Sequence, residues 1–160
     1  MEEMTLDCRF MHRALELSAA AAAHGNEPFG AVLVKDGRIV YENENRIYTA
    51  HDPTFHGEMG LIRRFCEETG ITDLGDYTLY SSCEPCFMCS GAMVWTRLGR
   101  LVYGASNQDL EDLLGKPDRG CPCSRMVFDH SSHAPAVTAG VLRESCLAVL
   151  REYFSRHDKG

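Results

Sequence analysis

Four side chains near the middle of the chain are of types that could together carry out metal-assisted hydrolysis. His56 and Glu58 lie on either side of one glycine, and Cys86 and Cys89 follow farther along in the pattern Pro-Cys-Phe-Met-Cys. One imidazole and two thiolates supply three ligands for a tetrahedral Zn²⁺, which leaves one coordination position for water. Glu58 could accept and return the proton of that water. We therefore predict one zinc ion per chain, with His56, Cys86 and Cys89 as ligands and Glu58 as the catalytic acid and base.

A helix can bring the two cysteines of this pattern together. Positions i and i+3 share one helix face, and the sequence predicts a helix over 85–95 with Cys86 and Cys89 in its first turns. Unpaired amides and the helix dipole favour thiolates there, and Pro85 suits a first turn; two buried core thiols are the alternative. Cys83 could add a fourth ligand and close a structural Cys₃His site, but we expect it to end a strand and pack in the core.

His56 and Glu58 pose a geometric requirement, because residues two apart do not share a helix face. Both can reach one metal only if His56 lies in the opening turn of its helix. The sequence predicts this helix from Pro53, capped by Asp52 or Thr54, to about residue 69, with an inner face of Phe55, Met59, Ile62 and Cys66. The alternative for Glu58 is an exposed first-turn acid that complements the helix dipole.

The remaining patterns alternate strands with helices. Helices are predicted over 7–24 (capped by Asp7, with Phe10, Ala14, Leu17 and Ala21 on its inner face), 107–114 and 141–156. Strands are predicted over 31–34, 38–42, 77–82, 101–103 and 136–138, with a hairpin turn at Asp36-Gly37. Nothing definite is predicted for 115–134. The helix over 85–95 is apolar on most of its circumference, so we expect it to be buried all round or against a second subunit. These elements predict an α/β sandwich whose first strands are antiparallel and whose later strands are parallel.

Size and composition fit one soluble domain over residues 1–160. The formal net charge is −7, from 16 basic and 23 acidic residues, which argues against a nucleic-acid partner. There is no apolar run long enough to span a membrane. Three of the eight cysteines, Cys83, Cys86 and Cys89, have metal-ligand spacing rather than a disulfide pattern. We therefore expect a cytoplasmic protein.

At this point the chain resembles the cytidine-deaminase-like superfamily, in the branch of guanine deaminases and tRNA adenosine deaminases. The resemblance covers nearly the whole chain and includes Pro28-Phe29-Gly30-Ala31-Val32, Asn45, Asp52-Pro53-Thr54, His56-x-Glu58, Ser82-Cys83-Glu84-Pro85-Cys86-x-Met88-Cys89 and Gly91-Ala92-Met93. The pattern H-x-E…P-C-x-x-C is the signature of zinc nucleobase deaminases. The resemblance implies a three-layer α/β/α sandwich with a five-stranded mixed sheet, and a homodimer with the apolar helix at or near its interface. It also implies that the metal ligands and proton shuttle fall on the four residues already named.

Two further residues are candidates for substrate binding. The resemblance implies that Asn45 binds the base, whose edge an amide can both donate to and accept from; the alternative is a turn-forming asparagine. Phe29 could form a stacking wall for the ring, or pack in the core.

The substrate signals conflict. The Pro28-Phe29-Gly30 and Ser82–Cys86 segments resemble guanine and guanosine deaminases, whereas 91–104 and the final helix resemble the tRNA enzymes. His-Gly-Glu replaces the usual His-Ala-Glu of both and resembles fungal cytosine deaminase. We expect a small free base or nucleoside, guanine-type first, with cytosine or cytidine and tRNA adenosine as alternatives.

The region 105–135 matches this family least and is expected to shape the pocket. Cys121, Cys123, His130 and His133 could form a second metal site there, but their spacing favours ordinary loop thiols. A zinc-stabilised binding module without turnover is the non-enzymatic alternative, although a structural zinc site usually has four ligands.

Overall fold

The fold is built on one five-stranded sheet. A computed structural model describes residues 4–115 and 123–157. Within those residues the elements are, in order, α1 (Leu6–Ala23), β1 (Gly30–Lys35), β2 (Arg38–Glu44), α2 (Gly57–Thr69), β3 (Thr78–Cys83), α3 (Phe87–Trp95), β4 (Arg100–Ala105), α4 (Asn107–Leu114), α5 (Cys123–Asp129), β5 (Ala136–Ala139) and α6 (Arg143–His157). Every predicted element is present, and α5 is an element that was not predicted.

The sheet has the order β2-β1-β3-β4-β5. β1 pairs antiparallel with both β2 and β3, whereas β3–β4 and β4–β5 are parallel. The β1–β2 hairpin turns at Asp36 and Gly37, which both have positive φ (51° and 72°), as the Asp-Gly pair predicts. The predicted five-stranded mixed sheet is confirmed.

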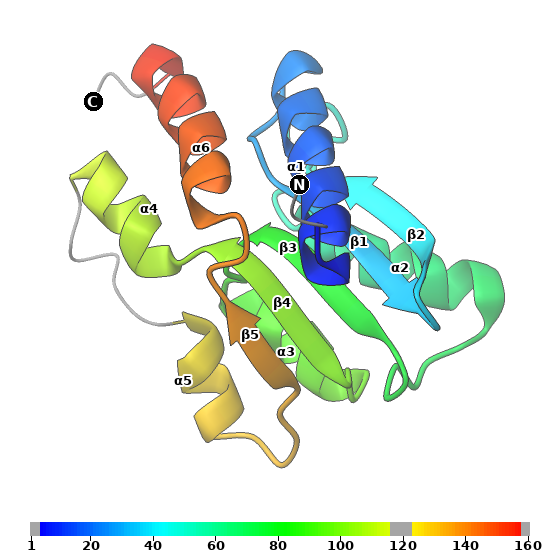
Figure 1. Cartoon of the computed structure of the whole chain (residues 1–160). Helices are drawn as coiled ribbons and strands as arrows, with labels where there is room; N and C mark the ends of the chain where they lie inside the picture. Colours follow the sequence, from blue (N-terminus) through cyan, green and yellow to red (C-terminus); the bar gives the residue numbers. More distant parts are fainter. Residues whose placement is uncertain (1–3, 116–122, 158–160) are drawn as a thin grey trace.

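Helices cover both faces of the sheet, which gives the predicted three layers (Figure 1). In β1, Val32 and Val34 belong to a core under α1 and α6, and the alternating Ala31 and Leu33 belong to the opposite core, with α2, α3 and α5. The three central strands, β1, β3 and β4, therefore contribute side chains to both cores. No helix in the described residues is long and apolar enough to cross a bilayer.

One edge of the sheet gathers the segments that carry the chemical residues. Gly30 at the start of β1 is level with Glu44 at the end of β2, and Cys83 at the end of β3 is level with Ala105 at the end of β4. Gly30 N also donates to Ser82 Oγ (3.2 Å), which ties β1 to β3 at this edge. The loops that leave this edge lead directly into α2, α3 and α4.

Two helix starts differ from prediction. Thr5 rather than Asp7 caps α1, by accepting from Cys8 N. Helix α2 begins at Gly57 and not near Pro53, because Asp52 closes a separate turn by accepting from Thr54 N (2.9 Å) and Thr54 Oγ1 (2.6 Å).

The buried faces of three helices also differ from prediction. In α2, Ile62 is buried as predicted, together with Leu61 and Phe65, whereas Met59 and Cys66 are only half-buried. Helix α3 begins at Phe87 rather than Pro85 and is not buried all round in the monomer, since the Trp95 side chain is 88% exposed. In α1, Ala14, Leu17 and Ala21 are buried as predicted, but Phe10 is only half-buried and its neighbour Met11 is fully buried.

Candidate metal centre

The three predicted metal ligands converge at the amino ends of two helices. His56 is the N-cap residue of α2, and Cys86 is the N-cap residue of α3. His56 Nδ1 lies 3.6 Å from Cys86 Sγ and 3.7 Å from Cys89 Sγ. Their ligand atoms all lie within 4.8 Å of one another, and the described residues contain no other such group of donors.

These separations fit a tetrahedral zinc ion. With Zn–S near 2.3 Å and Zn–N near 2.0–2.1 Å, a tetrahedral angle puts a sulfur and a nitrogen ligand about 3.6 Å apart. The separations of 3.6 Å and 3.7 Å therefore leave room for Zn²⁺ between His56, Cys86 and Cys89 without any change of backbone. The donor set, one imidazole and two thiols, is also of the type zinc prefers.

Cys83 does not join this group. It is 5% exposed and belongs to the core under α1 and α6, on the opposite face of the sheet from α2 and α3. Burial, followed by the charge of Glu58, raises the pKa of the Cys83 thiol well above its ordinary value. The described residues therefore form a three-donor group and not a closed Cys₃His site.

Glu58 lies in the first turn of α2 with its side chain buried. His56 is the N-cap residue, and its backbone is extended (φ −72°, ψ 160°) rather than helical. Its side chain therefore need not point to the opposite side of the helix from Glu58, and both side chains reach the metal centre. Glu58 is 6% exposed, so it is not the solvated first-turn acid of the alternative interpretation. Burial raises the pKa of its carboxyl to about 7, and the charge of the Cys86 thiolate adds to this effect. A carboxyl with a pKa near neutrality can both accept and donate a proton.

The two thiols titrate very differently. The hydrogen bond from Cys89 lowers the pKa of Cys86 to about 4, with a further contribution from His56. The same hydrogen bond to Cys86, together with burial, raises the pKa of Cys89 well above its usual range. The hydrogen bond to Cys86 also raises the pKa of His56. This lowered pKa favours the thiolate form of Cys86, as does the place of Cys86 at a helix N-terminus.

Buried asparagines that sequence analysis missed hold the loops around this group. Asn43 Nδ2 donates to the Gly57 carbonyl (3.0 Å) and so ties the end of β2 to the start of α2. Asn26, 1% exposed, accepts from Tyr48 N (3.0 Å) and Thr49 N (3.1 Å) and joins the two loops beside the site. Asparagines in polar stretches are common in exposed turns, so the sequence carries no signal that separates these two from surface residues.

The two predicted substrate-binding residues lie at the same sheet edge. Asn45 is 2% exposed, donates its backbone N–H to the Phe29 carbonyl (2.9 Å) and accepts from Ile47 N at Oδ1 (3.1 Å). That last bond is the turn-forming contact of the alternative interpretation. Phe29 is half-buried and packs against the core under α1 and α6. Base binding by Asn45 and stacking by Phe29 stay predictions.

The second cysteine–histidine group is not assembled in the described residues. Cys121 lies outside them. His130 Nδ1 lies 2.8 Å from the Met126 carbonyl and His133 Nε2 lies 2.9 Å from the Leu98 carbonyl. Cys123 begins α5, and none of these three described residues belongs to a group of metal donors.

Comparison with known proteins identifies one family, and the relatives include guanine deaminases and tRNA adenosine deaminases. Residues 4–105 match the family model described as the cytidine and deoxycytidylate deaminase zinc-binding region. A guanine deaminase of Bacillus subtilis is 45% identical over 101 residues, 62% of this chain and 65% of that protein. A tRNA-specific adenosine deaminase of Agrobacterium fabrum is 37% identical over 145 residues, 91% of each chain. The solved structure of guanine deaminase from Nitrosomonas europaea has a TM-score of 0.78 and 27% identity, covering 92% of this chain and 84% of that one.

Proposed function

Because the chain belongs to the cytidine and deoxycytidylate deaminase zinc-binding family of hydrolytic deaminases, we propose that it removes an exocyclic amine from a small nucleobase or nucleoside, of the guanine or guanosine type. Water supplies the oxygen, and ammonia leaves. One observation carries the proposal: His56, Cys86 and Cys89 present their ligand atoms within 4.8 Å of one another beside a buried carboxyl, Glu58.

In the proposed mechanism His56, Cys86 and Cys89 would hold one Zn²⁺, and Glu58 would move protons. A zinc ion with three protein ligands keeps a position for water and lowers the pKa of that water to about 7. Glu58 accepts one proton from the attacking water and passes it to the ring nitrogen as the new C–O bond forms. It then accepts the remaining proton of the added hydroxyl and passes it to the amine, which leaves as ammonia when the C–N bond breaks. Its buried position keeps bulk water from competing for these transfers, and its pKa near 7 suits both directions. Asn45 would orient the base by its amide, and Phe29 would lie against the ring.

Charge supports a small neutral substrate. The net charge of −7 opposes a polyanion. After the hydrogen bond to Cys86, the charge of Glu27 is among the causes that raise the pKa of His56, and after burial it also raises the pKa of Tyr153. Glu27 thus adds negative charge near both His56 and Tyr153, which would oppose a phosphate group there.

A tRNA adenosine is the second candidate. The tRNA-specific relative matches 91% of its own length, against 65% for the guanine deaminase of B. subtilis. The last turns of α6 also stack Tyr153 on His157 (4.1 Å between ring centres) and carry Arg156. An aromatic and basic surface of this kind suits nucleic-acid bases and phosphates.

The discriminating experiment is ammonia release from guanine, guanosine, cytosine, cytidine, adenosine and a tRNA anticodon stem, using zinc-loaded protein. Fastest release from guanine or guanosine supports the proposal. Release from the tRNA stem alone, lost at high salt, would replace it with the second candidate, and release from cytosine or cytidine alone would replace it with a pyrimidine deaminase. If zinc-bound protein releases no ammonia from any of them, the proposed deaminase activity on these substrates is contradicted, and the zinc-stabilised binding module is supported instead.

We also propose a homodimer formed through α3. Six apolar side chains from α2 and α3 line a shallow groove on the surface: Met59, Ile62, Phe87, Met88, Ala92 and Trp95. Phe87 is 49% exposed and Trp95 88% exposed, although both belong to a helix whose sequence is apolar on most sides. A second copy of the same face would remove this surface from water. The thiol-rich metal centre suits a reducing compartment, so we propose a cytoplasmic location.

A further inference from the structure

A buried carboxyl group lies in the loop that presents Cys86. Glu84 stands between the end of β3 and the start of α3, two residues before Cys86, and is 8% exposed. Its backbone N–H donates to the Ala105 carbonyl (2.8 Å), which extends the β3–β4 ladder by one step. A buried carboxyl needs hydrogen-bonding partners to offset its desolvation, so the identity of those partners matters.

Both carboxyl oxygens of Glu84 have hydrogen-bonding partners outside the metal loop, the segment 84–86 between β3 and α3 that presents Cys86. Oε1 accepts from the backbone N–H of Asn107, the first residue of α4 (2.9 Å), and Oε2 accepts from Ser124 Oγ in α5. Among the described residues no arginine or lysine forms an ion pair with Glu84. Its side chain is therefore held by two neutral donors from two different helices.

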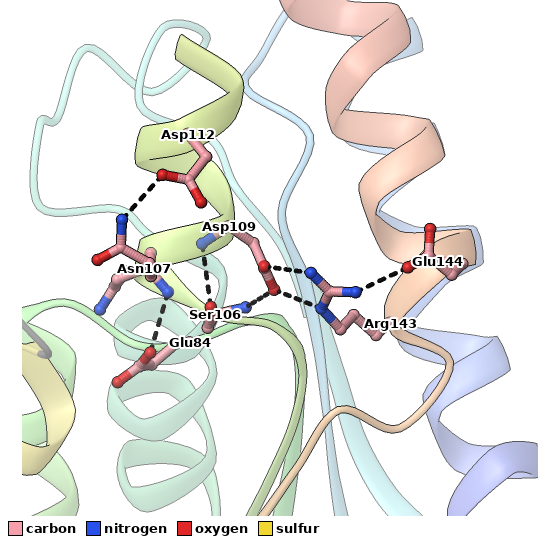
Figure 2. Close-up of polar contacts among 8 residues, drawn as sticks. Glu84, Ser106, Asn107, Asp109, Asp112, Arg143 and Glu144 are labelled. Carbon is pink, nitrogen blue, oxygen red and sulfur yellow. Dashed lines mark hydrogen bonds and ion pairs between the residues drawn. The ribbon is translucent and has the colours of Figure 1, made fainter. Parts of the chain in front are cut away.

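Helix α4 is itself held firmly in place (Figure 2). Ser106 caps it in a reciprocal capping box with Asp109. Arg143, at the start of α6, donates two hydrogen bonds to the Asp109 carboxylate (2.6 and 2.9 Å). Figure 2 shows these contacts as one connected row from Glu144 through Arg143 and Asp109 to the amino end of α4, where Glu84 joins it.

We propose that Glu84 is a positioning residue of the metal centre, which fixes the loop carrying Cys86 by bonding it to α4 and α5. The inference rests on the proposed zinc site. The proposal also gives a role to two helices inside residues 105–135, the region that matches the family least: α4 and α5 supply the two donors that bond to Glu84. Residues that hold metal ligands in place are worth about 10- to 100-fold in metal affinity.

The test compares zinc binding by wild type, Glu84→Ala, Glu84→Gln and Ser124→Ala in competition with a chromophoric chelator. Glu84→Ala should weaken zinc binding about 10- to 100-fold. Ser124→Ala should weaken it about 2- to 10-fold, since one hydrogen bond is lost. Glu84→Gln should stay close to wild type, because the amide keeps an acceptor for Asn107 N–H and can donate to the Ser124 hydroxyl.

Asp112→Ala is the matched control, because Asp112 is an exposed acid of α4 that accepts from Gln108 and does not contact Glu84. It should bind zinc as wild type does. The absorption spectrum of the Co²⁺-substituted protein gives a second readout: the sulfur-to-cobalt and d–d bands should shift in Glu84→Ala and be restored in Glu84→Gln.

Wild-type affinity and an unchanged cobalt spectrum in Glu84→Ala would overturn the inference, as would equal weakening by Asp112→Ala. If Glu84→Ala fails to fold, Ser124→Ala decides, and unchanged zinc binding there would overturn the inference. None of these readouts needs a substrate. A wild-type protein that binds no zinc would contradict the proposed metal site, whereas one that binds zinc without deaminating would contradict only the proposed activity.

Discussion

His56 Nδ1 lies 3.6 Å from Cys86 Sγ although 30 residues separate them, because each is the N-cap residue of its own helix. An N-cap residue has extended backbone, and its side chain points back over the helix start. Two helices that begin at one sheet edge therefore bring an imidazole and a thiol together, and Cys89 adds the second thiol from one turn farther on.

This convergence predicts that Cys86 is required for zinc binding and that Cys83 is not. Cys86→Ala should weaken zinc binding by more than about 100-fold, beyond what loss of a supporting residue causes. Cys83→Ala should leave the zinc content at one per chain, because Cys83 packs in the opposite core. Elemental analysis after dialysis measures both variants. Equal zinc loss in the two would make Cys83 a ligand and contradict the three-donor site.

Glu58→Gln should lower turnover about 10²- to 10⁴-fold while zinc stays bound. The substitution keeps the shape of the side chain but removes the group that accepts the proton. Glu67→Gln is the control, because Glu67 is an exposed acid on the same helix. Ammonia release and zinc content are measured on the same samples. A Glu58→Gln variant that kept more than a few per cent of the activity would disprove this role.

The features predicted correctly are those that local spacing determines. The Asp36-Gly37 turn follows from residues that tolerate positive φ, and the strands follow from short apolar runs beside turn residues. Cys86 and Cys89 come together because three residues make about one helical turn. The requirement that His56 lie at the start of its helix also needed only local geometry.

The features that were missed depend on contacts between distant segments. The start of α2 was placed too early because Asp52-Pro53-Thr54 looks like a helix cap, whereas Asp52 closes its own turn. Glu84 lies in the segment 82–89 that resembles the family, but its hydrogen-bonding partners come from α4 and α5, which sequence spacing cannot reveal. Helix α5 lies among glycine, proline and histidine residues that mask its periodicity.

The ion pair between Asp7 and Arg100 predicts that the folded state loses stability in acid. Its hydrogen bonds to Arg100 (2.7 and 3.0 Å) lower the pKa of the Asp7 carboxyl below 3.8, and Tyr80 donates a further bond (2.7 Å). A lowered folded-state pKa adds stability above pH 3.8 that is lost as the pH falls through the folded pKa. Asp7→Asn should therefore be less stable than wild type at pH 7, by about 1 kcal/mol because the pair is partly solvated.

The check is urea unfolding of wild type and Asp7→Asn at pH 7 and near pH 3. The difference in unfolding free energy should shrink at the lower pH. Asp76→Asn serves as the control, because Asp76 is exposed. A difference independent of pH would show that the substitution acts through packing and not through the charge of Asp7.

Trp95 offers a direct measure of the proposed dimer, because it is the single tryptophan of the chain and is 88% exposed in the monomer. Its fluorescence should shift to the blue as protein concentration rises, since the partner would shield the indole from water. Trp95→Glu should sediment as a monomer, because it would bury a charge in an apolar contact. Val40→Glu, at an exposed apolar position of β2, should still sediment as a dimer. A wild type that stays monomeric at all concentrations would contradict this interface.

Gly57 and Gly60 should respond in opposite ways to replacement by alanine. A Cβ at Gly57 would meet no atom closer than the Phe29 carbonyl oxygen at 3.4 Å, so the folded state can accept alanine. Gly57→Ala should raise the unfolding free energy by about 0.4–1 kcal/mol, because alanine lowers the conformational entropy of the unfolded chain. A Cβ at Gly60 would lie 2.5 Å from Asn43 Nδ2 and 2.7 Å from the Phe55 ring. Gly60→Ala should therefore cost about 1–3 kcal/mol.

The Gly60 substitution should also weaken zinc binding, because displaced Asn43 would lose its hydrogen bond to the Gly57 carbonyl, beside His56. Gly57→Ala should bind zinc as wild type does, because a Cβ at this position would meet no atom closer than 3.4 Å. Thermal unfolding and chelator competition measure both properties in one series. If Gly57→Ala instead lost stability or zinc, the glycine would be required by a close approach of the loop that carries Phe29.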